Sequence, residues 1–244
     1  MDDSRIKRPE NGVLEKLPEA EYQRLKPHLE PQTLKQGQPL HRSSKPLSGV
    51  YFLTDGVASL IIRDSLESCL ELSIVGNEST VGERAIFAHD LRTIESSMLT
   101  DGSGFMVAPD VFRDEFYRFG AFHDLILNNL EARIIETSQT ALCNRAHPLE
   151  KRLVRWLLTV ADRLRSETLR IRQEDIAARL HVTRTSISAA ASKMRERGLI
   201  DYQRGEITIV DRHDCEEIAC ECYRIIENTR SIYFKPVPTN GSHS

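Results

Sequence analysis

The chain of 244 residues is long enough for one large domain or two modest ones, and its 40% hydrophobic and 28% charged residues are typical of a globular protein. Its net charge of -3 excludes a protein that coats nucleic acid with its whole surface, so any contact with DNA must be local. No stretch reaches the roughly 18 consecutive apolar residues that span a bilayer, and the charged N-terminus lacks the apolar region of a signal peptide. We therefore expect a cytoplasmic protein that makes no contact with a membrane.

Residues 1–110 have the pattern of an antiparallel β-domain. From Leu34 to about Val107, short apolar runs rich in β-formers alternate with turn residues. Asp55 and Gly56 stand between two such runs, and this pair favours the tight turn of a β-hairpin because glycine tolerates a positive φ. The pattern predicts a compact antiparallel barrel or sandwich.

A long helical pattern follows over residues 111–146. Its apolar residues recur at spacings of three and four, and no proline interrupts them. One interpretation is a helix that packs on the β-domain, and another is a seam that pairs with a second copy of the chain. His147 and Pro148 then predict a break, because proline disfavours helical geometry in the residue before it. We place a C-terminal domain at residues 147–230 and a flexible tail at residues 231–244.

Two helical patterns separated by a very short link lie within residues 173–197. Thr183 suits the N-cap of the second helix, because its hydroxyl can accept a hydrogen bond from an otherwise unpaired backbone N–H. His181 takes the turn position that normally holds a glycine with positive φ, a conformation that histidine tolerates better than most residues. After Gly198, which marks the helix end, two short strands predict a β-wing that folds back near Gly205. The segment predicts a winged helix-turn-helix, and a helical pair that only packs is the alternative.

The outer face of the second helix supplies the candidate DNA contacts. A helix-turn-helix places the N-terminal part of its second helix in the major groove, so the early positions read base edges. Arg184 can bond bidentately to guanine, whereas Thr185 and Ser188 discriminate less between bases. The segment from 163 to 204 carries ten arginine and lysine residues against five acidic ones, a surplus of five positive charges. Candidate phosphate contacts, which set affinity rather than sequence preference, are Thr183, Lys193, Arg195 and Arg204.

Over nearly its whole length the sequence resembles the Crp/Fnr superfamily of bacterial transcription regulators. The resemblance lies in GVYFLTDGVASLI and VGERAIF, in the long helix, and in IRQEDIAARLHVTRTSISAAASKMRERGLIDYQRGEITI. It implies an α+β fold with an N-terminal antiparallel β-barrel (a double-stranded β-helix, jelly-roll-like), a long dimerisation helix and a C-terminal winged helix-turn-helix. It also implies a homodimer on an inverted repeat of double-stranded DNA, with RNA polymerase as a further partner. Thr185 departs from the glutamate common at its position, so the half-site should differ from the best-known TGTGA type.

The same resemblance points to a small-molecule site in the N-terminal barrel, which would control DNA binding. Members that bind cyclic nucleotides hold the ribose and phosphate with a Gly-Glu and an Arg-Ser pair, and meet the base with a Thr-Ser pair on the dimer helix. Here Glu83 would accept from a ribose hydroxyl and Arg92 would pair with the phosphate. A degenerate sensor, in which these are ordinary surface and helix residues, is the alternative. The candidate ligand residues are Gly82, Glu83, Arg92, Thr93, Thr137 and Ser138.

Five cysteines, an odd number, predict free thiols rather than a disulfide framework. Cys220 and Cys222, two apart on a predicted helix, point in nearly opposite directions, so chelation of a metal by this pair is awkward. Cys215, Ala219 and Cys222 share one helical face instead. A metal site or thiol switch that includes His213 is the alternative, but the pattern favours small core residues and no metal.

Other cofactors and activities have less support. An iron–sulphur cluster is not expected, because family members that carry one have an N-terminal cysteine group and the first cysteine here is Cys69. A haem bound by His41 or His89 is a less favoured alternative, since lone histidines are more often surface or core residues. We find no nucleophile elbow, phosphate loop or zinc-protease helix, so we expect no enzyme. A cyclic-nucleotide-binding signalling protein that acts through protein contacts rather than DNA is the alternative function.

Overall fold

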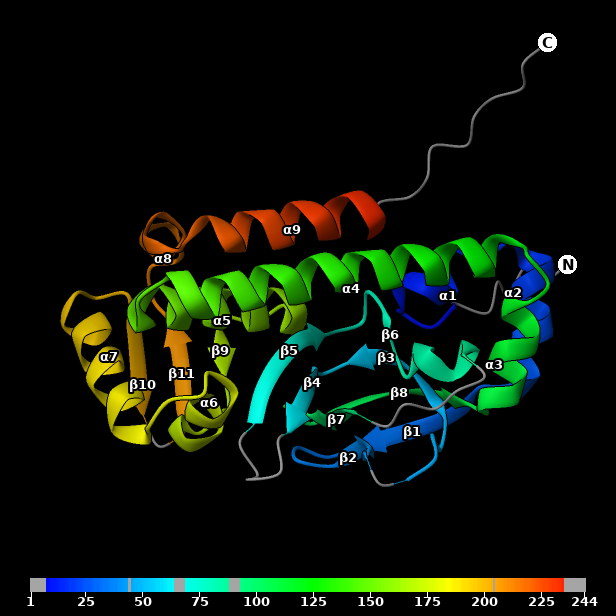
Figure 1. Cartoon of the computed structure of the whole chain (residues 1–244), viewed down its shortest axis with the longest axis horizontal. Coiled ribbons are helices and arrows are strands. Elements are labelled where there is room, and N and C mark those ends of the chain that lie inside the picture. The colour runs from blue at the N-terminus through cyan, green and yellow to red at the C-terminus, as the bar shows by residue number, and fades with distance from the viewer. Residues whose placement is uncertain (1–7, 44, 64–68, 88–92, 204, 235–244) are drawn as a thin grey trace, which may run out of the picture.

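The structure is a computed structural model that describes residues 8–43, 45–63, 69–87, 93–203 and 205–234. The sequence predictions on Arg92, Arg204, His89 and residues 235–244 therefore lie outside the described residues. Two layers of strands lie beneath a pair of long helices, and a smaller helical and stranded unit lies at one end (Figure 1).

The N-terminal domain consists of two four-stranded antiparallel sheets, with strand orders β1-β8-β3-β6 and β2-β7-β4-β5. Buried apolar residues from both sheets, among them Leu34, Leu53, Leu60 and Met98, pack into one core. The jelly-roll-like prediction is confirmed, but the two sheets do not form a closed barrel. The strands are β1 (Glu30–Leu34), β2 (Pro39–His41), β3 (Val50–Asp55), β4 (Ala58–Arg63), β5 (Cys69–Val75), β6 (Thr80–Val81), β7 (Ile94–Met98) and β8 (Gly102–Val107). Short helices flank them: α1 (Gly12–Lys16), α2 (Glu19–Leu25), η1 (Lys26–His28) and η2 (Glu83–Ile86).

The prediction of a β-hairpin at Asp55 and Gly56 is wrong, because β3 and β4 belong to different sheets. The chain does turn there, and Gly56 has φ +77°, but β3 pairs with β8 and β6 whereas β4 pairs with β5 and β7 in the other sheet. A Cβ atom on Gly56 would lie 2.5 Å from the carbonyl oxygen of Asp101. The glycine therefore lets two chain segments approach closely where the chain passes from one sheet to the other.

The single helix predicted over 111–146 is two helices, α3 (Pro109–Phe116) and α4 (Ala121–Ala146). Phe119 is in the left-handed region with φ +56°, which interrupts the helix. The carboxylate of Glu21 then caps α4, since it accepts hydrogen bonds from the backbone N–H groups of Ala121 and Phe122 at 3.0 and 2.8 Å. A residue a hundred positions earlier thus fixes where α4 begins.

The C-terminal unit starts after the break at His147 and Pro148, since α4 ends at Ala146 and α5 begins at Leu149. One buried core joins α5 to the helices and strands that follow it, with Trp156 among its fully buried side chains. The elements are α5 (Leu149–Leu164), β9 (Thr168–Leu169), α6 (Gln173–Arg179), α7 (Arg184–Glu196), β10 (Ile200–Gln203), β11 (Glu206–Ile209), α8 (Arg212–Ile218) and α9 (Glu221–Phe234). The predicted tail is thus wrong for residues 231–234, which belong to α9.

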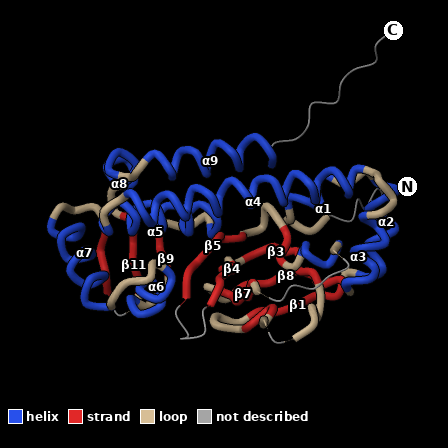
Figure 2. The backbone as a smooth tube through the Cα atoms, viewed as in Figure 1, coloured by secondary structure: helices blue, strands red, loops and turns tan. Residues whose placement is uncertain are grey.

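Helix α9 packs alongside α4, and both helices run along one side of the strands (Figure 2). Buried polar contacts tie the two units together. The indole nitrogen of Trp156 in α5 donates to the carboxylate of Glu71 in β5 at 2.5 Å. In the part of the chain that the structure describes, no helix is both long and apolar enough to span a membrane.

Candidate DNA-binding surface and ligand cavity

Helices α6 and α7 form a helix-turn-helix whose turn is held by local hydrogen bonds. The backbone N–H of Val182 donates to the carbonyl oxygen of Ala177 at 3.0 Å, which closes the end of α6. His181 has φ +51°, so it adopts the left-handed conformation predicted for the turn. The hydroxyl of Thr183 accepts from the backbone N–H of Ser186 at 3.2 Å, which confirms Thr183 as the N-cap of α7.

The inward face of α7 is buried and its outward face is exposed. Ile187, Ala190, Ala191 and Met194 pack in the core with α5 and α6. This packing orients the helix, because a one-residue rotation would place apolar side chains in water. Strands β10 and β11 follow as an antiparallel pair, in the position of the predicted wing.

The structure places the three predicted base-reading residues together on the exposed face of the first two turns of α7. The side chain of Arg184 is 72% exposed, and its only ion pair among the described residues is a loose one, 3.8 Å from Nε to a carboxylate oxygen of Glu174. The hydroxyl of Thr185 lies 2.8 Å from that of Thr183, and Ser188 follows one turn later. A cation and two hydroxyls therefore face outward from the N-terminal end of this helix.

Two of the predicted phosphate contacts flank this face. Lys193 is exposed on α7. Arg195 is also exposed, and its Nε lies 3.1 Å from a carboxylate oxygen of Asp201. An ion pair on the surface contributes about 0–1 kcal/mol, so Arg195 can exchange Asp201 for a phosphate at little cost.

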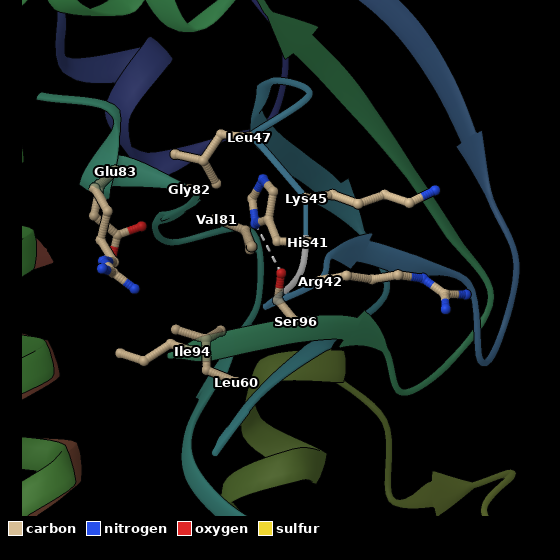
Figure 3. A pocket seen from close by; sticks show the side chains of 11 residues that line it. His41, Arg42, Lys45, Leu47, Leu60, Val81, Gly82, Glu83, Ile94 and Ser96 are labelled. Atoms are coloured by element: carbon tan, nitrogen blue, oxygen red, sulfur yellow. Dashed lines mark hydrogen bonds between the residues drawn. The ribbon is translucent and has the colours of Figure 1, made fainter. Parts of the chain in front are cut away.

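A cavity of about 90 Å³ opens in the N-terminal domain next to the predicted ligand residues Gly82 and Glu83 (Figure 3). Gly82 has φ +103°, and a Cβ atom there would lie 2.6 Å from Cε1 of His41, so a side chain at this position would collide with the wall. The ring of His41 is fixed by Ser96, 2.9 Å from Nδ1, and by the carbonyl oxygen of Gly49, 2.8 Å from Nε2. The wall consists of His41, Arg42, Lys45, Leu47, Leu60, Val81, Gly82, Glu83, Arg84, Ile94 and Ser96.

The carboxylate of Glu83 is occupied by a partner that the sequence did not point to. Glu83 is buried, and Nε of Arg133 in α4 donates to it at 2.9 Å. The other guanidinium nitrogens of Arg133 donate to the hydroxyls of Ser73 and Ser79 and to the carbonyl oxygen of Thr80. The only sequence signal for Arg133 was its place one helical turn before Thr137. Glu83 therefore binds α4 through Oε1, whereas its buried Oε2 has no hydrogen-bond partner among the described residues.

The remaining predicted ligand residues do not converge on this cavity. Thr137 is half-buried and Ser138 is exposed on α4, where the Ser138 hydroxyl donates to the carbonyl oxygen of Ile134 at 2.8 Å. Neither residue lines the cavity, and neither does the exposed Thr93. The described cavity is smaller than the roughly 300–1,000 Å³ of typical ligand sites. Glu83 is the buried acid in its wall, and Arg42 and Lys45 extend away from the cavity (Figure 3).

Comparisons with known proteins agree with this architecture. Residues 151–218 match the model of the Crp-like helix-turn-helix domain. A protein described as a regulator of the Crp/Fnr family from Eubacterium rectale ATCC 33656 is similar in structure, with a TM-score of 0.67, 19% identity, and coverage of 84% of this chain and 96% of that chain. No curated protein matches the sequence.

Two further solved structures extend the likeness. The c-di-GMP-responsive global regulator CLP of Xanthomonas campestris has a TM-score of 0.64 and 17% identity over 80% of this chain and 100% of that chain. FixK2 from Bradyrhizobium japonicum has a TM-score of 0.67 and 13% identity over 79% of this chain and 98% of that chain. At these identities the likeness shows a shared fold, which extends over both the stranded domain and the helix-turn-helix.

Proposed function

We infer that this chain, a Crp/Fnr-superfamily protein by its Crp-like helix-turn-helix domain and its fold, is a transcription regulator that binds specific DNA sequences. The observation that carries this proposal is the outward face of α7, where Arg184, Thr185 and Ser188 stand exposed at the N-terminal end of a helix held by a buried inner face. This is the part of a recognition helix that enters the major groove. A signalling protein that acted only through protein contacts would have no use for such a face. DNA is therefore the favoured partner, and a cytoplasmic location follows from it.

We propose that the chain acts as a homodimer formed along α4. Leu127, Ile134 and Leu142 are large apolar residues on this helix that remain 44%, 66% and 50% exposed. Leu127 and Ile134 are seven residues apart, which is the repeat of a coiled-coil seam, and Leu142, eight residues further on, lies at the edge of the same apolar stripe. A two-fold axis along this stripe would present two copies of α7 to one side of the DNA, which matches an inverted repeat. RNA polymerase is the further partner that we propose for a regulator bound at such a site.

Selection of bound sequences from a random DNA pool tests the proposal most directly. We expect an inverted repeat whose half-sites are separated by about one helical turn, roughly 10–10.5 base pairs from centre to centre. Because Thr185 lacks a carboxylate that would accept from cytosine, we expect a half-site other than TGTGA. Absence of enrichment, together with no shift of any probe in a gel, would overturn the proposal in favour of a protein-binding role.

Two substitutions separate base reading from phosphate binding. Arg184→Ala should cost roughly 1–3 kcal/mol per half-site and relax the preference for one base, because it removes a bidentate donor to guanine. Lys193→Ala should weaken binding to all sequences alike and lower its salt dependence. Titration of the selected site and of a scrambled one at two salt concentrations measures both effects. Identical behaviour of the two variants would contradict the assignment of their roles.

We also propose that a small molecule in the N-terminal cavity controls DNA binding. The support is a partly enclosed space whose wall includes Gly82, where a Cβ atom would collide with His41, and the buried acid Glu83. Cyclic AMP and cyclic GMP are the first ligands to test by calorimetry. A ligand hydroxyl that reached Glu83 would donate to Oε2, which has no hydrogen-bond partner among the described residues, or compete with Arg133 for Oε1, so we expect binding to alter the environment of α4. No heat and no thermal shift at millimolar nucleotide would exclude these ligands.

A further inference from the structure

Four side chains that can bind a metal converge where α4 meets the C-terminal helices. They are Cys143, His147, Cys220 and Cys222, and their ligand atoms all lie within 4.8 Å of one another. The sulphur atoms of Cys143 and Cys220 are 3.6 Å apart, and the sulphur of Cys222 is 3.7 Å from Nδ1 of His147. The three cysteines are at most 3% exposed and form a small buried cluster of their own.

The fold brings the four residues together from two distant segments. Cys143 lies in the last turn of α4, and His147 stands four residues later in the break before α5. Cys220 lies between α8 and α9, and Cys222 is in the first turn of α9. Because Cys220 precedes the first residue of α9, it does not lie within one helix with Cys222, and the sequence argument against chelation by this pair is wrong.

The placement of Cys215 agrees with its predicted core role, but Cys222 does not share that face. Cys215 packs with Ala219 in the core of the C-terminal unit, whereas Cys222 faces the cluster with Cys143. Cys215 is therefore a core residue, whereas Cys143, Cys220 and Cys222 form a separate cluster.

Two of the six separations among these ligand atoms are close to those expected around a single tetrahedral ion. With zinc–sulphur and zinc–nitrogen bonds of about 2.3 and 2.0–2.1 Å, tetrahedral geometry separates two sulphurs by about 3.8 Å and a sulphur from a nitrogen by about 3.5 Å. The Cys143–Cys220 and Cys222–His147 separations are within about 0.2 Å of these values. The other pairs extend to at most 4.8 Å, so binding of one ion would draw them together by up to about 1 Å. A disulfide would instead need a sulphur–sulphur distance of about 2.05 Å, so Cys143 and Cys220 are reduced in this arrangement.

The surroundings suit a centre with net negative charge. Three thiolates and one neutral imidazole around Zn²⁺ carry a net charge of -1. Arg155, a buried residue of α5, lies close enough to interact electrostatically with Cys143 and Cys222, and its Nε has no hydrogen-bond partner among the described residues.

We propose that Cys143, His147, Cys220 and Cys222 bind one Zn²⁺ ion that fastens the end of α4 to the start of α9. Four protein ligands leave no open position, so the ion is structural rather than catalytic. It sits at the break between the stranded domain and the helix-turn-helix, and it would fix the angle at which α5 leaves α4. This inference does not depend on DNA binding, because metal content and DNA affinity are measured separately.

Metal analysis of the full-length protein, purified without chelators, tests the proposal. We expect about one zinc per chain in the wild type and less than about a tenth of that in Cys220→Ser. Cys69→Ser is the matched control, because Cys69 is also a buried cysteine but lies in β5 outside the cluster, and it should keep its zinc. EDTA should lower the melting temperature of the wild type and of the control, but not that of Cys220→Ser. The proposal would be overturned if the wild type contained no zinc and failed to take up added Zn²⁺. It would also be overturned if the protein contained iron with visible absorption, or if Cys143 and Cys220 formed a disulfide in protein purified under reducing conditions.

A second variant decides the case if Cys220→Ser does not fold. His147→Cys retains four ligands, so it should keep about one metal ion per chain. With Co²⁺ in place of zinc, the absorption spectrum should show a tetrahedral ion with sulphur ligands and should change between the wild type and His147→Cys as nitrogen is replaced by sulphur. An identical Co²⁺ spectrum in both proteins would remove His147 from the ligand set and overturn the site as proposed.

Discussion

Thr183 combines two roles that a substitution can separate. Its hydroxyl caps α7 through the backbone N–H of Ser186, and the same hydroxyl is a predicted phosphate contact. Thr183→Ala should lower the free energy of unfolding by about 0.5–2 kcal/mol, because one N–H of the first turn loses its partner. Thr183→Ser keeps the hydroxyl and should remain close to the wild type. Urea denaturation of the two variants measures the difference, and equal loss in both would assign the effect to the methyl group instead.

Glu71 makes the free energy of unfolding depend on pH because its carboxyl group is buried, not because it lies in an ion pair. Burial raises its pKa above the ordinary value of 4.5, against the positive charge of Arg179 and hydrogen bonds from Ser59 and Trp156. The folded state therefore holds this proton more tightly than the unfolded state does. The contribution to stability is complete below pH 4.5 and is lost as the pH rises through the raised pKa of the folded state.

Because the pKa of Glu71 is raised in the folded state, its ionised form destabilises the fold at neutral pH. Glu71→Gln should be more stable than the wild type at neutral pH, because its neutral amide can still accept from Trp156 and donate to Ser59. The advantage should shrink toward zero as the pH falls below about 4.5, where both side chains are neutral. Chemical denaturation of the two proteins at several pH values checks this. An advantage that grew toward acid pH would contradict the raised pKa.

At the scale of elements, Arg163 holds α5 against three other parts of the chain. Its side chain is 2% exposed, and its guanidinium lies 3.1 Å from Glu78, 2.8 Å from Glu227 and 3.9 Å from Glu136. These carboxylates come from the turn after β5, from α9 and from α4. Among the described residues, Arg163→Met removes the cation shared by Glu78, Glu136 and Glu227 and leaves only Glu227 with another, the partly exposed Arg230, so we expect a loss of about 3–5 kcal/mol.

A neighbouring surface pair provides the control for Arg163. Arg230 contacts Glu227 at 2.8 Å, but its side chain is 32% exposed. Arg230→Met should cost no more than about 1 kcal/mol, because water screens this pair. Thermal or urea unfolding compares the two variants directly. A similar small loss of stability in both variants would mean that water solvates the carboxylates around residue 163 once the arginine is removed.

Local patterns predicted the elements well, and distant partners account for what the patterns missed. The helix-turn-helix was readable because its periodicity, its N-cap at Thr183 and its turn at His181 lie within a few residues of one another. The hairpin at Gly56 was predicted wrongly because the choice between β4 and β8 as the partner of β3 is made by packing between two sheets. The break before α4 depends on Glu21, which no local pattern around Phe119 could indicate.

The candidate sites follow the same rule. The exposed face of α7 was predictable from helical spacing alone. The partner of Glu83 was not, because Arg133 lies 50 residues away in the sequence, and the cysteine cluster joins Cys143 to Cys220 across 77 residues. Only the folded path of α4 and α9 brings these groups together.

At the scale of the whole molecule, the apolar stripe of Leu127, Ile134 and Leu142 on α4 is exposed to water, and a second copy of the chain would bury it. Exposed large apolar side chains at regular spacing are unfavourable in water, and burial contributes roughly 25 cal/mol for each Å² of apolar surface. Ile134 lies at the middle of this stripe. In the proposed dimer it would therefore be surrounded by apolar atoms of the partner, where a charge is poorly tolerated.

Ile134→Glu should therefore convert the proposed dimer into monomers, because two carboxylates would have to be buried side by side on the two-fold axis. Val210→Glu is the matched control: Val210 is 61% exposed, against 66% for Ile134, but it lies beyond β11 and away from α4. Sedimentation at several protein concentrations should show a dimer for the wild type and Val210→Glu, and a monomer for Ile134→Glu. Since a monomer engages only one half-site, Ile134→Glu should also bind the full inverted repeat about 10² to 10⁴ times more weakly than the wild type. A dimer that persisted in Ile134→Glu would place the subunit interface elsewhere on the molecule.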